Sequence, residues 1–201
     1  MTAEPTVRTR KALVRRLRSV FRKDWAASTA VAARDLLAVR PENGLGWFRL
    51  GGALADMARY REAFAALRRA LGLARAADRD LVHWRIAEAH DARGALRLAE
   101  RHYRLAVAAN PDEASWRIML GALLARMGRL REAAAVHRRA VRCKLGPRDE
   151  AWLNLGLVLR AQERHAEARQ CFRRALRLDP RDRDAKQALR DVDYVLRGVR
   201  P

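Results

Sequence analysis

The histidines and cysteines are the residues of this chain whose chemistry could support catalysis or metal binding. His83 and His90 are close enough to share a helix, but no acidic or sulfur side chain stands at a spacing that completes a metal site. Cys143 and Cys171 lie in periodic helical sequence, away from the helix N-termini that favour a thiolate, so we expect two buried, reduced thiols. The sequence predicts no catalytic residue, no metal site and no cofactor, and therefore a protein that is not an enzyme.

Positive charge is the most unusual property of the chain. Of its 201 residues, 43 are Lys or Arg and 23 are Asp or Glu, which gives a formal net charge of +20. Nearly all of this charge is arginine, and such a field attracts anionic partners. Arginine pairs recur at one place in three of the expected helices and are the possible anion-binding residues: Arg68, Arg69, Arg138, Arg139, Arg173 and Arg174.

Two interpretations of these arginines stay open. Like charges four residues apart, such as Arg138 and Arg142, mildly destabilise a helix, and the phosphates of a nucleic acid or of an anionic lipid surface would relieve that repulsion without reading sequence. Alternatively, the pairs form a solvated helix face in an arginine-rich chain. The second interpretation is favoured, because no aromatic residues alternate with the basic ones in an RNA-binding pattern.

The N-terminal segment is a basic amphipathic stretch. Leu13, Leu17, Val20 and Phe21 recur at helical spacing among many arginines, whereas residues 1–9 are predicted to be disordered. The helix reads as the first helix of a degenerate repeat, a membrane-surface helix or a targeting helix, and its continuity with the next helix favours the first of these. Because the chain has no long apolar run and no secretory signal pattern, we expect a cytoplasmic location.

The chain also repeats one pattern of large and small apolar residues. The clearest copy begins at Asp149, and its pattern consists of Trp152, Leu155, Gly156, Leu159, Ala168, Phe172, Ala175 and Pro180. This segment resembles the tetratricopeptide repeat, which has a period of about 34 residues; only Leu159 departs from it, standing where tyrosine is usual. Two helices pack closely where one presents Gly or Ala to a large side chain of the other, so we expect Gly156 and Ala168 to be contact points.

Weaker copies of the same pattern precede this one. The predicted organisation is residues 1–9, a degenerate basic repeat at 10–43, four repeats at 44–77, 80–113, 114–147 and 149–182, and a capping helix with a tail at 183–201. The phase slips at Asp78, Arg79 and Arg148, which we expect to lie in loops. The resemblance implies an all-α fold, a right-handed superhelix of antiparallel helix pairs with four to five repeats.

The resemblance further implies a concave groove lined by the first helix of each repeat, where the second and fifth positions, among others, face a bound peptide. The fifth positions form an apolar stripe, and the sixth positions supply polar donors in three of four repeats. The partner-binding groove is thus predicted to consist of Phe48, Arg49, Trp84, Arg85, Ile118, Met119, Leu153 and Asn154. A phase error of one residue would instead place these side chains in the core.

The function predicted from these patterns is a non-enzymatic adaptor or scaffold that binds another protein or a peptide segment, with no small-molecule substrate. The alternative is an accessory protein that binds a polyanion, either nucleic acid or an anionic membrane surface, through its arginines and its basic N-terminal helix. A third possibility is the regulatory part of an enzyme whose catalytic chain is separate. The two leading hypotheses place the binding residues on different helices.

Overall fold

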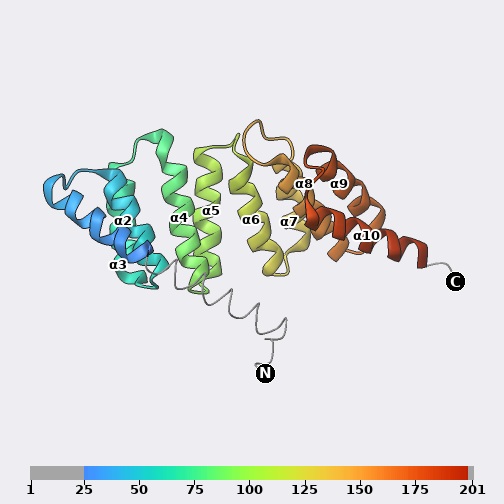
Figure 1. Ribbon diagram of the computed structural model, residues 1–201, viewed down its shortest axis with the longest axis horizontal. Helices are drawn as coiled ribbons and strands as arrows, with labels where there is room; N and C mark the ends of the chain where they lie inside the picture. The colour runs from blue at the N-terminus through green and yellow to red at the C-terminus, as the bar shows by residue number, and fades with distance from the viewer. Residues whose placement is uncertain (1–24, 199–201) are drawn as a thin grey trace, which may run out of the picture. The chain divides into compact units, whose positions relative to one another are not determined.

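The structure is a computed structural model that describes residues 25–198. The predictions for the basic N-terminal helix and for residues 1–9 lie outside the described residues. The described part is helical throughout (Figure 1). It consists of a helix at residues 25–39, α2 (Gly44–Asp56), α3 (Tyr60–Leu73), the short 3₁₀ helix η1 (Ala76–Asp78), α4 (Arg79–Ala92), α5 (Leu96–Ala109), α6 (Ala114–Arg126), α7 (Leu130–Ala140), α8 (Arg148–Ala161), α9 (His165–Leu178) and α10 (Arg183–Gly198). No described helix is long and apolar enough to cross a membrane.

The helices group into two compact units that divide between Arg93 and Gly94. The first unit contains the helix at 25–39, α2, α3 and α4, and the second contains α5 to α10. Within each unit, helices that follow each other in the chain pack against each other, as in the pairs α2–α3, α6–α7 and α8–α9. The division falls inside the repeat predicted for residues 80–113.

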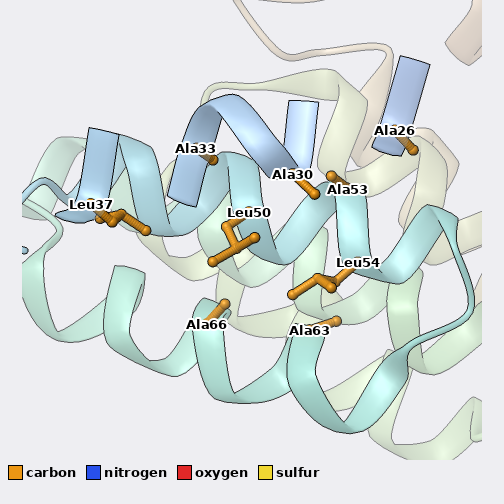
Figure 2. Close-up of a cluster of buried hydrophobic side chains, with 9 residues drawn as sticks. All are labelled: Ala26, Ala30, Ala33, Leu37, Leu50, Ala53, Leu54, Ala63 and Ala66. Carbon is orange, nitrogen blue, oxygen red and sulfur yellow. The ribbon is translucent and has the colours of Figure 1, made fainter. Parts of the chain in front are cut away.

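The core of the first unit is built mainly from alanines and leucines. Figure 2 shows how three helices supply it: Ala26, Ala30, Ala33 and Leu37 come from the helix at 25–39, Leu50, Ala53 and Leu54 from α2, and Ala63 and Ala66 from α3. Small side chains let the helix backbones approach closely, and the leucines fill the space that remains. The helix at 25–39 therefore belongs to the same core as α2 and α3.

Glycines of first helices meet large side chains of second helices, as the repeat pattern predicts. A Cβ atom added to Gly51 would lie 2.6 Å from Leu67 Cγ, and one added to Gly121 would lie 2.5 Å from His137 Cε1. Gly156 faces the Phe172 ring in the same way. Since real Cβ atoms do not approach so closely, these glycines are required for the packing of each helix pair.

The turn inside each repeat has a fixed local structure. One residue takes a positive φ angle: Ala58 (61°), Gly94 (79°), Gly128 (77°) and Glu163 (61°). In three repeats the next residue is an arginine, and its Nε and Nη2 atoms donate to the two carboxylate oxygens of a glutamate three residues later, at 2.6–2.7 Å. These pairs are Arg59 with Glu62, Arg129 with Glu132, and Arg164 with Glu167. This bidentate pair fixes the start of the second helix.

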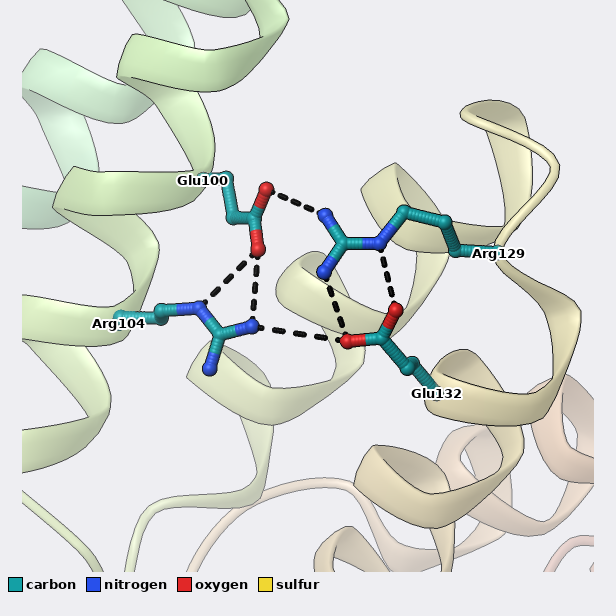
Figure 3. A network of polar contacts seen from close by, with 4 residues as sticks. All are labelled: Glu100, Arg104, Arg129 and Glu132. Atoms are coloured by element: carbon teal, nitrogen blue, oxygen red, sulfur yellow. Dashed lines mark hydrogen bonds and ion pairs between the residues drawn. The ribbon is translucent and has the colours of Figure 1, made fainter.

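In the second unit, one of these pairs belongs to a larger network. Glu100 of α5 accepts hydrogen bonds from Arg129 at 2.6 Å and from Arg104 at 2.8 Å (Figure 3). Burial alone would raise the pKa of Glu100, but the hydrogen bonds from Arg104 and Arg129 outweigh it and lower that pKa. The network thereby ties α5 to the start of α7.

Of the residues that break the repeat phase, Asp78 lies in the connection between α3 and α4, as predicted, whereas Arg79 and Arg148 are the first residues of helices. Asp78 ends η1, Arg79 begins α4, and Arg148 begins α8. The extra residue is instead accommodated upstream, because α7 ends early and residues 141–147 fold back onto the start of α6. There the Leu145 N–H donates to the Asp112 carbonyl and the Leu145 carbonyl accepts from the Ala114 N–H, both at 3.0 Å.

Candidate functional site

An apolar pocket opens on the first unit where α2 begins, α3 ends and α4 begins. Its volume is about 450 Å³, and its apolar walls come from Leu45, Phe48, Ala70, Leu73, Ala74, Leu81 and Val82. Three of these leucines are well exposed, with 58% of Leu45, 44% of Leu73 and 43% of Leu81 accessible to water. A cluster of accessible leucines around a concave site is suited to hold an apolar side chain of a ligand.

The rim of the pocket carries one ion pair. Arg75 and Asp78 line the pocket and are joined by a hydrogen bond of 2.8 Å from Arg75 Nε to Asp78 Oδ2. That hydrogen bond raises the pKa of Arg75. The two charges thus compensate each other at the rim, and most of the remaining wall is apolar.

The predicted groove residues of the first unit have different environments. Phe48 lines the apolar pocket, and Arg49 is exposed. Trp84 is half-buried beneath the guanidinium of Arg85, at 5.9 Å from the ring centroid.

Arg85 is already engaged by groups of the chain, and its predicted contact with a ligand stays a prediction. Its guanidinium binds Asp56 at 2.7 Å, Glu88 at 2.8 Å and the Gly52 carbonyl at 3.0 Å. Two carboxylates already compensate its charge, and its side chain is 19% exposed. Arg85 thus links α4 to α2 within the first unit.

The predicted groove residues of the second unit are less accessible than expected. Ile118 is 2% exposed, so it is a core residue and cannot contact a ligand, which corrects its predicted role. Met119 and Leu153 are half-buried. Asn154 donates from Nδ2 to the Glu150 carbonyl of its own helix at 2.9 Å. Ile118 is buried because α6 packs against α5, α7 and α8, so that residues all around this helix, Trp116 among them, lie in the core.

A second, polar cavity of about 330 Å³ lies in the second unit between α7, α8 and α9. Its walls are Arg138, Val141, Arg142, Trp152, Leu155, Leu159, Glu167, Gln170, Cys171 and Arg174. The guanidinium of Arg174 covers the Trp152 ring at 4.6 Å from the centroid, within the range of a cation–π contact. Three arginines from two elements therefore surround one cavity.

Two of the six predicted anion-binding arginines, Arg138 and Arg174, line this cavity. Arg139 and Arg173 are their exposed neighbours in sequence and are not part of its wall. In the first unit, Arg68 and Arg69 are exposed, and Arg69 lies 5.7 Å from the Trp47 ring centroid. In the second unit, one arginine of each pair therefore lines the cavity, and Arg174 is both in the cavity wall and exposed to water.

Both cysteines are free and buried, which agrees with the prediction of two buried, reduced thiols. Burial raises the pKa of the Cys171 thiol to about 11, although Arg174 and Arg138 act in the opposite direction. Cys171 is therefore a neutral thiol in the wall of the polar cavity at physiological pH. The described residues contain no group of three or more side chains that could hold a metal ion.

Sequence reasoning missed the leucines of the apolar pocket. Leu45 and Leu81 both occupy the second position of their repeats, which the resemblance implies to be a ligand-facing position. The predicted groove residues come only from the fifth and sixth positions. Reading the second position as well would have placed Leu45 and Leu81 beside Phe48. Arg142 was recognised only through its repulsion with Arg138.

The chain is similar to known repeat proteins over most of its length. Tetratricopeptide repeat models match residues 46–76, 84–150 and 149–182. No curated protein matches the chain. Among solved structures, pilF of Pseudomonas aeruginosa has 27% identity and a TM-score of 0.67 over 79% of this chain and 71% of that chain.

Two further structures share the fold. MamA has 20% identity and a TM-score of 0.62, covering 74% of this chain and 85% of that chain. YrrB, a tetratricopeptide protein with an unusual peptide-binding site, has 18% identity and a TM-score of 0.61, covering 82% of this chain and 84% of that chain. The repeat pattern, the glycine contacts and these matches agree, and the chain belongs to the tetratricopeptide repeat family.

Proposed function

We propose that this chain is a non-enzymatic adaptor that binds a segment of another protein, and that the apolar pocket of the first unit receives a large apolar side chain of that segment. The observation that carries the proposal is the pocket of about 450 Å³ with three accessible leucines in its walls. Leucines that are exposed together cost free energy in water, and a partner that covers them recovers it.

The positions of the pocket residues support a peptide as the occupant. Leu45, Leu81 and Phe48 stand at second and fifth positions of their repeats, which the family resemblance assigns to ligand contact. A buried apolar anchor surrounded by weaker contacts is also the usual energetic arrangement of a protein–peptide interface. YrrB, which shares the fold, has a peptide-binding site.

The charge of the chain indicates what surrounds that anchor. With a formal net charge of +20, the protein attracts acidic segments and repels basic ones. Arg49 follows Phe48 directly, is exposed, and is available to an acidic side chain beside the anchor. The proposed occupant is therefore an acidic segment with one large apolar residue. Arg49, Trp84, Met119, Leu153 and Asn154 remain proposed contacts outside the pocket.

A pair of substitutions tests the pocket. Leu45→Asp and Leu81→Asp together place two carboxylates in its walls, and both positions lie in the first turn of a helix, where acidic residues are tolerated. The matched control is Leu98→Asp. Like Leu81, Leu98 is the third residue of its helix, and it is 46% exposed, but it belongs to the second unit. Circular dichroism should report folded protein for all variants.

The readout is affinity purification of the full chain from its native cells, with nuclease treatment and a wash at about 0.3 M salt, followed by mass spectrometry. We expect the original chain and Leu98→Asp to retain one discrete protein. The amount of this protein recovered with the double variant should be lower by at least about ten-fold. Equal retention by the double variant would reject the pocket. A set of nucleic-acid-binding proteins that disappears with nuclease would instead favour the polyanion function.

A further inference from the structure

The polar cavity of the second unit concentrates positive charge that the chain itself does not neutralise. Within residues 25–198, Arg138, Arg142 and Arg174 form no ion pair with a carboxylate. The acidic residue in the wall, Glu167, is held by Arg164 through two hydrogen bonds of 2.7 Å. The cavity wall therefore carries three guanidinium groups that no carboxylate of the wall neutralises.

Two neutral groups in the same wall are also able to donate hydrogen bonds. The indole N–H of Trp152 has no acceptor within the described part of the chain, whereas the equivalent Trp47 of the first unit donates to the Pro41 carbonyl at 2.7 Å. Gln170 lines the cavity and is exposed. A ligand in the cavity would therefore meet mainly donors, while the acceptors in the wall are the amide oxygen of Gln170 and the carboxylate of Glu167, which is paired with Arg164.

We propose that this cavity binds a dianionic phosphate group, presented either as the free ion or as a phosphorylated side chain of a partner. Guanidinium groups bind phosphate through planar, charge-assisted hydrogen bonds, and three of them around one small volume match a dianion. Such a group carries a charge of about −1.5 to −2 at neutral pH, against about −1 for each phosphate of a nucleic acid. A cavity with converging charges also suits a single group better than a continuous strand, which requires a track of cations.

The equivalent place in the first unit lacks some of these features, so a phosphate site is proposed in the second unit only. There Trp47 and Arg69 stand at the positions of Trp152 and Arg174 and make the longer contact of 5.7 Å. The position of Gln170 is occupied by Ala65, which cannot donate a hydrogen bond from its side chain. Arg142 follows the early end of α7, so the same irregularity that shortens α7 adds the third guanidinium.

Calorimetric titration of the full chain at about 50 mM salt tests the proposal. The probes are inorganic phosphate, N-acetylphosphoserine amide, N-acetylserine amide and an oligothymidylate without terminal phosphates. We expect both phosphate probes to bind and the serine amide not to bind. The affinity of the phosphoserine probe should fall below about pH 6, where its phosphate becomes a monoanion, and the affinity of inorganic phosphate should fall at a higher pH, because its second pKa is higher. Tighter binding of the phosphoserine probe assigns a phosphorylated partner, and tighter binding of inorganic phosphate assigns the free ion.

Matched variants separate the cavity from net charge. Arg138→Gln with Arg142→Gln removes two positive charges from the cavity wall, whereas Arg139→Gln with Arg173→Gln removes two from exposed neighbours outside it. We expect the first pair to weaken phosphate binding by at least about ten-fold and the second by less than about two-fold. Trp152→Phe keeps the ring beneath Arg174 but deletes the N–H, and should weaken binding by a smaller factor.

Three results would overturn the proposal. One is the absence of binding by both phosphate probes. Another is an equal loss of affinity in the two double variants, because binding would then depend on net charge alone. The third is binding of the oligothymidylate only, without pH dependence, which would assign a nucleic-acid surface in place of a phosphate cavity.

Discussion

The helix pairs α6–α7 and α8–α9 share one packing geometry but fill it with different chemistry. In both, a glycine of the first helix faces a ring of the second: Gly121 faces His137 and Gly156 faces Phe172. Both rings are fully buried, with 0% of each side chain exposed. Within residues 25–198, Nδ1 and Nε2 of His137 have no hydrogen-bond partner, whereas the side chain of Phe172 has no polar atom to satisfy. The same position holds Leu67 in the first unit, so it requires a large side chain, and it accepts a polar ring at a cost in stability.

The largest difference between the two pairs should appear when each ring is removed. Phe172→Ala leaves a cavity in the core of the last repeat and should lower the free energy of unfolding by about 3 to 5 kcal/mol. His137→Ala should cost about 1 to 3 kcal/mol less, because it also deletes two unsatisfied nitrogens. Urea denaturation of the full chain at pH 7.5 measures both values. Equal losses would show that the nitrogens of His137 carry no penalty.

The acid sensitivity of the two pairs should differ as well. Burial lowers the pKa of His137 from 6.5 to about 4. The unfolded chain therefore takes up a proton at this residue below about pH 6.5, while the folded chain does not until about pH 4, so stability falls as the pH decreases through this interval. At about 1.4 kcal/mol per pH unit, the contribution of His137 to this loss is about 3 kcal/mol.

His137→Phe tests that contribution by giving α7 the ring of α9. At pH 7.5 we expect the variant to be at least as stable as the original chain. Between pH 7.5 and pH 4, its free energy of unfolding should increase relative to that of the original chain by about 3 kcal/mol. Other groups titrate in both proteins, so the difference between the two pH profiles is the quantity to measure. Parallel profiles would mean that His137 is protonated equally in the folded and unfolded chains.

Two glutamates that pair with the arginines before α7 and α9 give a smaller contrast in stability. Glu100, whose side chain is 13% exposed, accepts from Arg104 and Arg129, whereas Glu167, at 50% exposed, pairs with Arg164 alone. Glu100→Gln should cost about 1.5 to 3 kcal/mol, since its acceptor is charged and largely buried, and Glu167→Gln less than about 1 kcal/mol. Because the pKa of Glu100 is lowered in the fold, its contribution should be lost as the pH falls below about 4.5.

Salt provides the control for that contrast. Exposed ion pairs weaken at about 1 M salt, while pairs that are largely buried are screened much less. The cost of Glu167→Gln should therefore nearly vanish at high salt, and the cost of Glu100→Gln should largely persist. If both costs vanish together, the Glu100 network behaves as an ordinary surface network.

The repeat pattern predicted the helix pairs because it depends on local spacing, but it predicted the binding residues only in part. Gly156 and Phe172 meet as expected, since both belong to one repeat and their distance in sequence fixes their contact. Ile118 was wrong because α6 is buried on several sides, which the pattern of one repeat does not reveal. The ion pair of Arg85 was not predicted, because its partner Asp56 lies 29 residues earlier and no local pattern reveals such a pair. Cavities likewise depend on several helices at once.

The turns of the two pairs should give the smallest effects, and they differ in sign. Glu163 takes a φ of 61° and Gly128 takes 77°, in the left-handed region where a side chain is strained. Glu163→Gly should therefore stabilise the last repeat by about 0.5 to 1 kcal/mol, and Gly128→Ala should destabilise its neighbour by about 1 kcal/mol.

Gly72 of α3 is the control for this last contrast, because it has no positive φ and nothing lies within 4 Å of an added Cβ. Gly72→Ala, at the penultimate residue of α3, should stabilise the chain by up to about 0.5 to 1 kcal/mol, since alanine has a higher helix propensity than glycine. The same exchange of Gly for Ala thus acts in opposite directions at Gly72 and Gly128. Denaturation midpoints that move in the same direction for both would show that backbone conformation at the turn does not decide the sign.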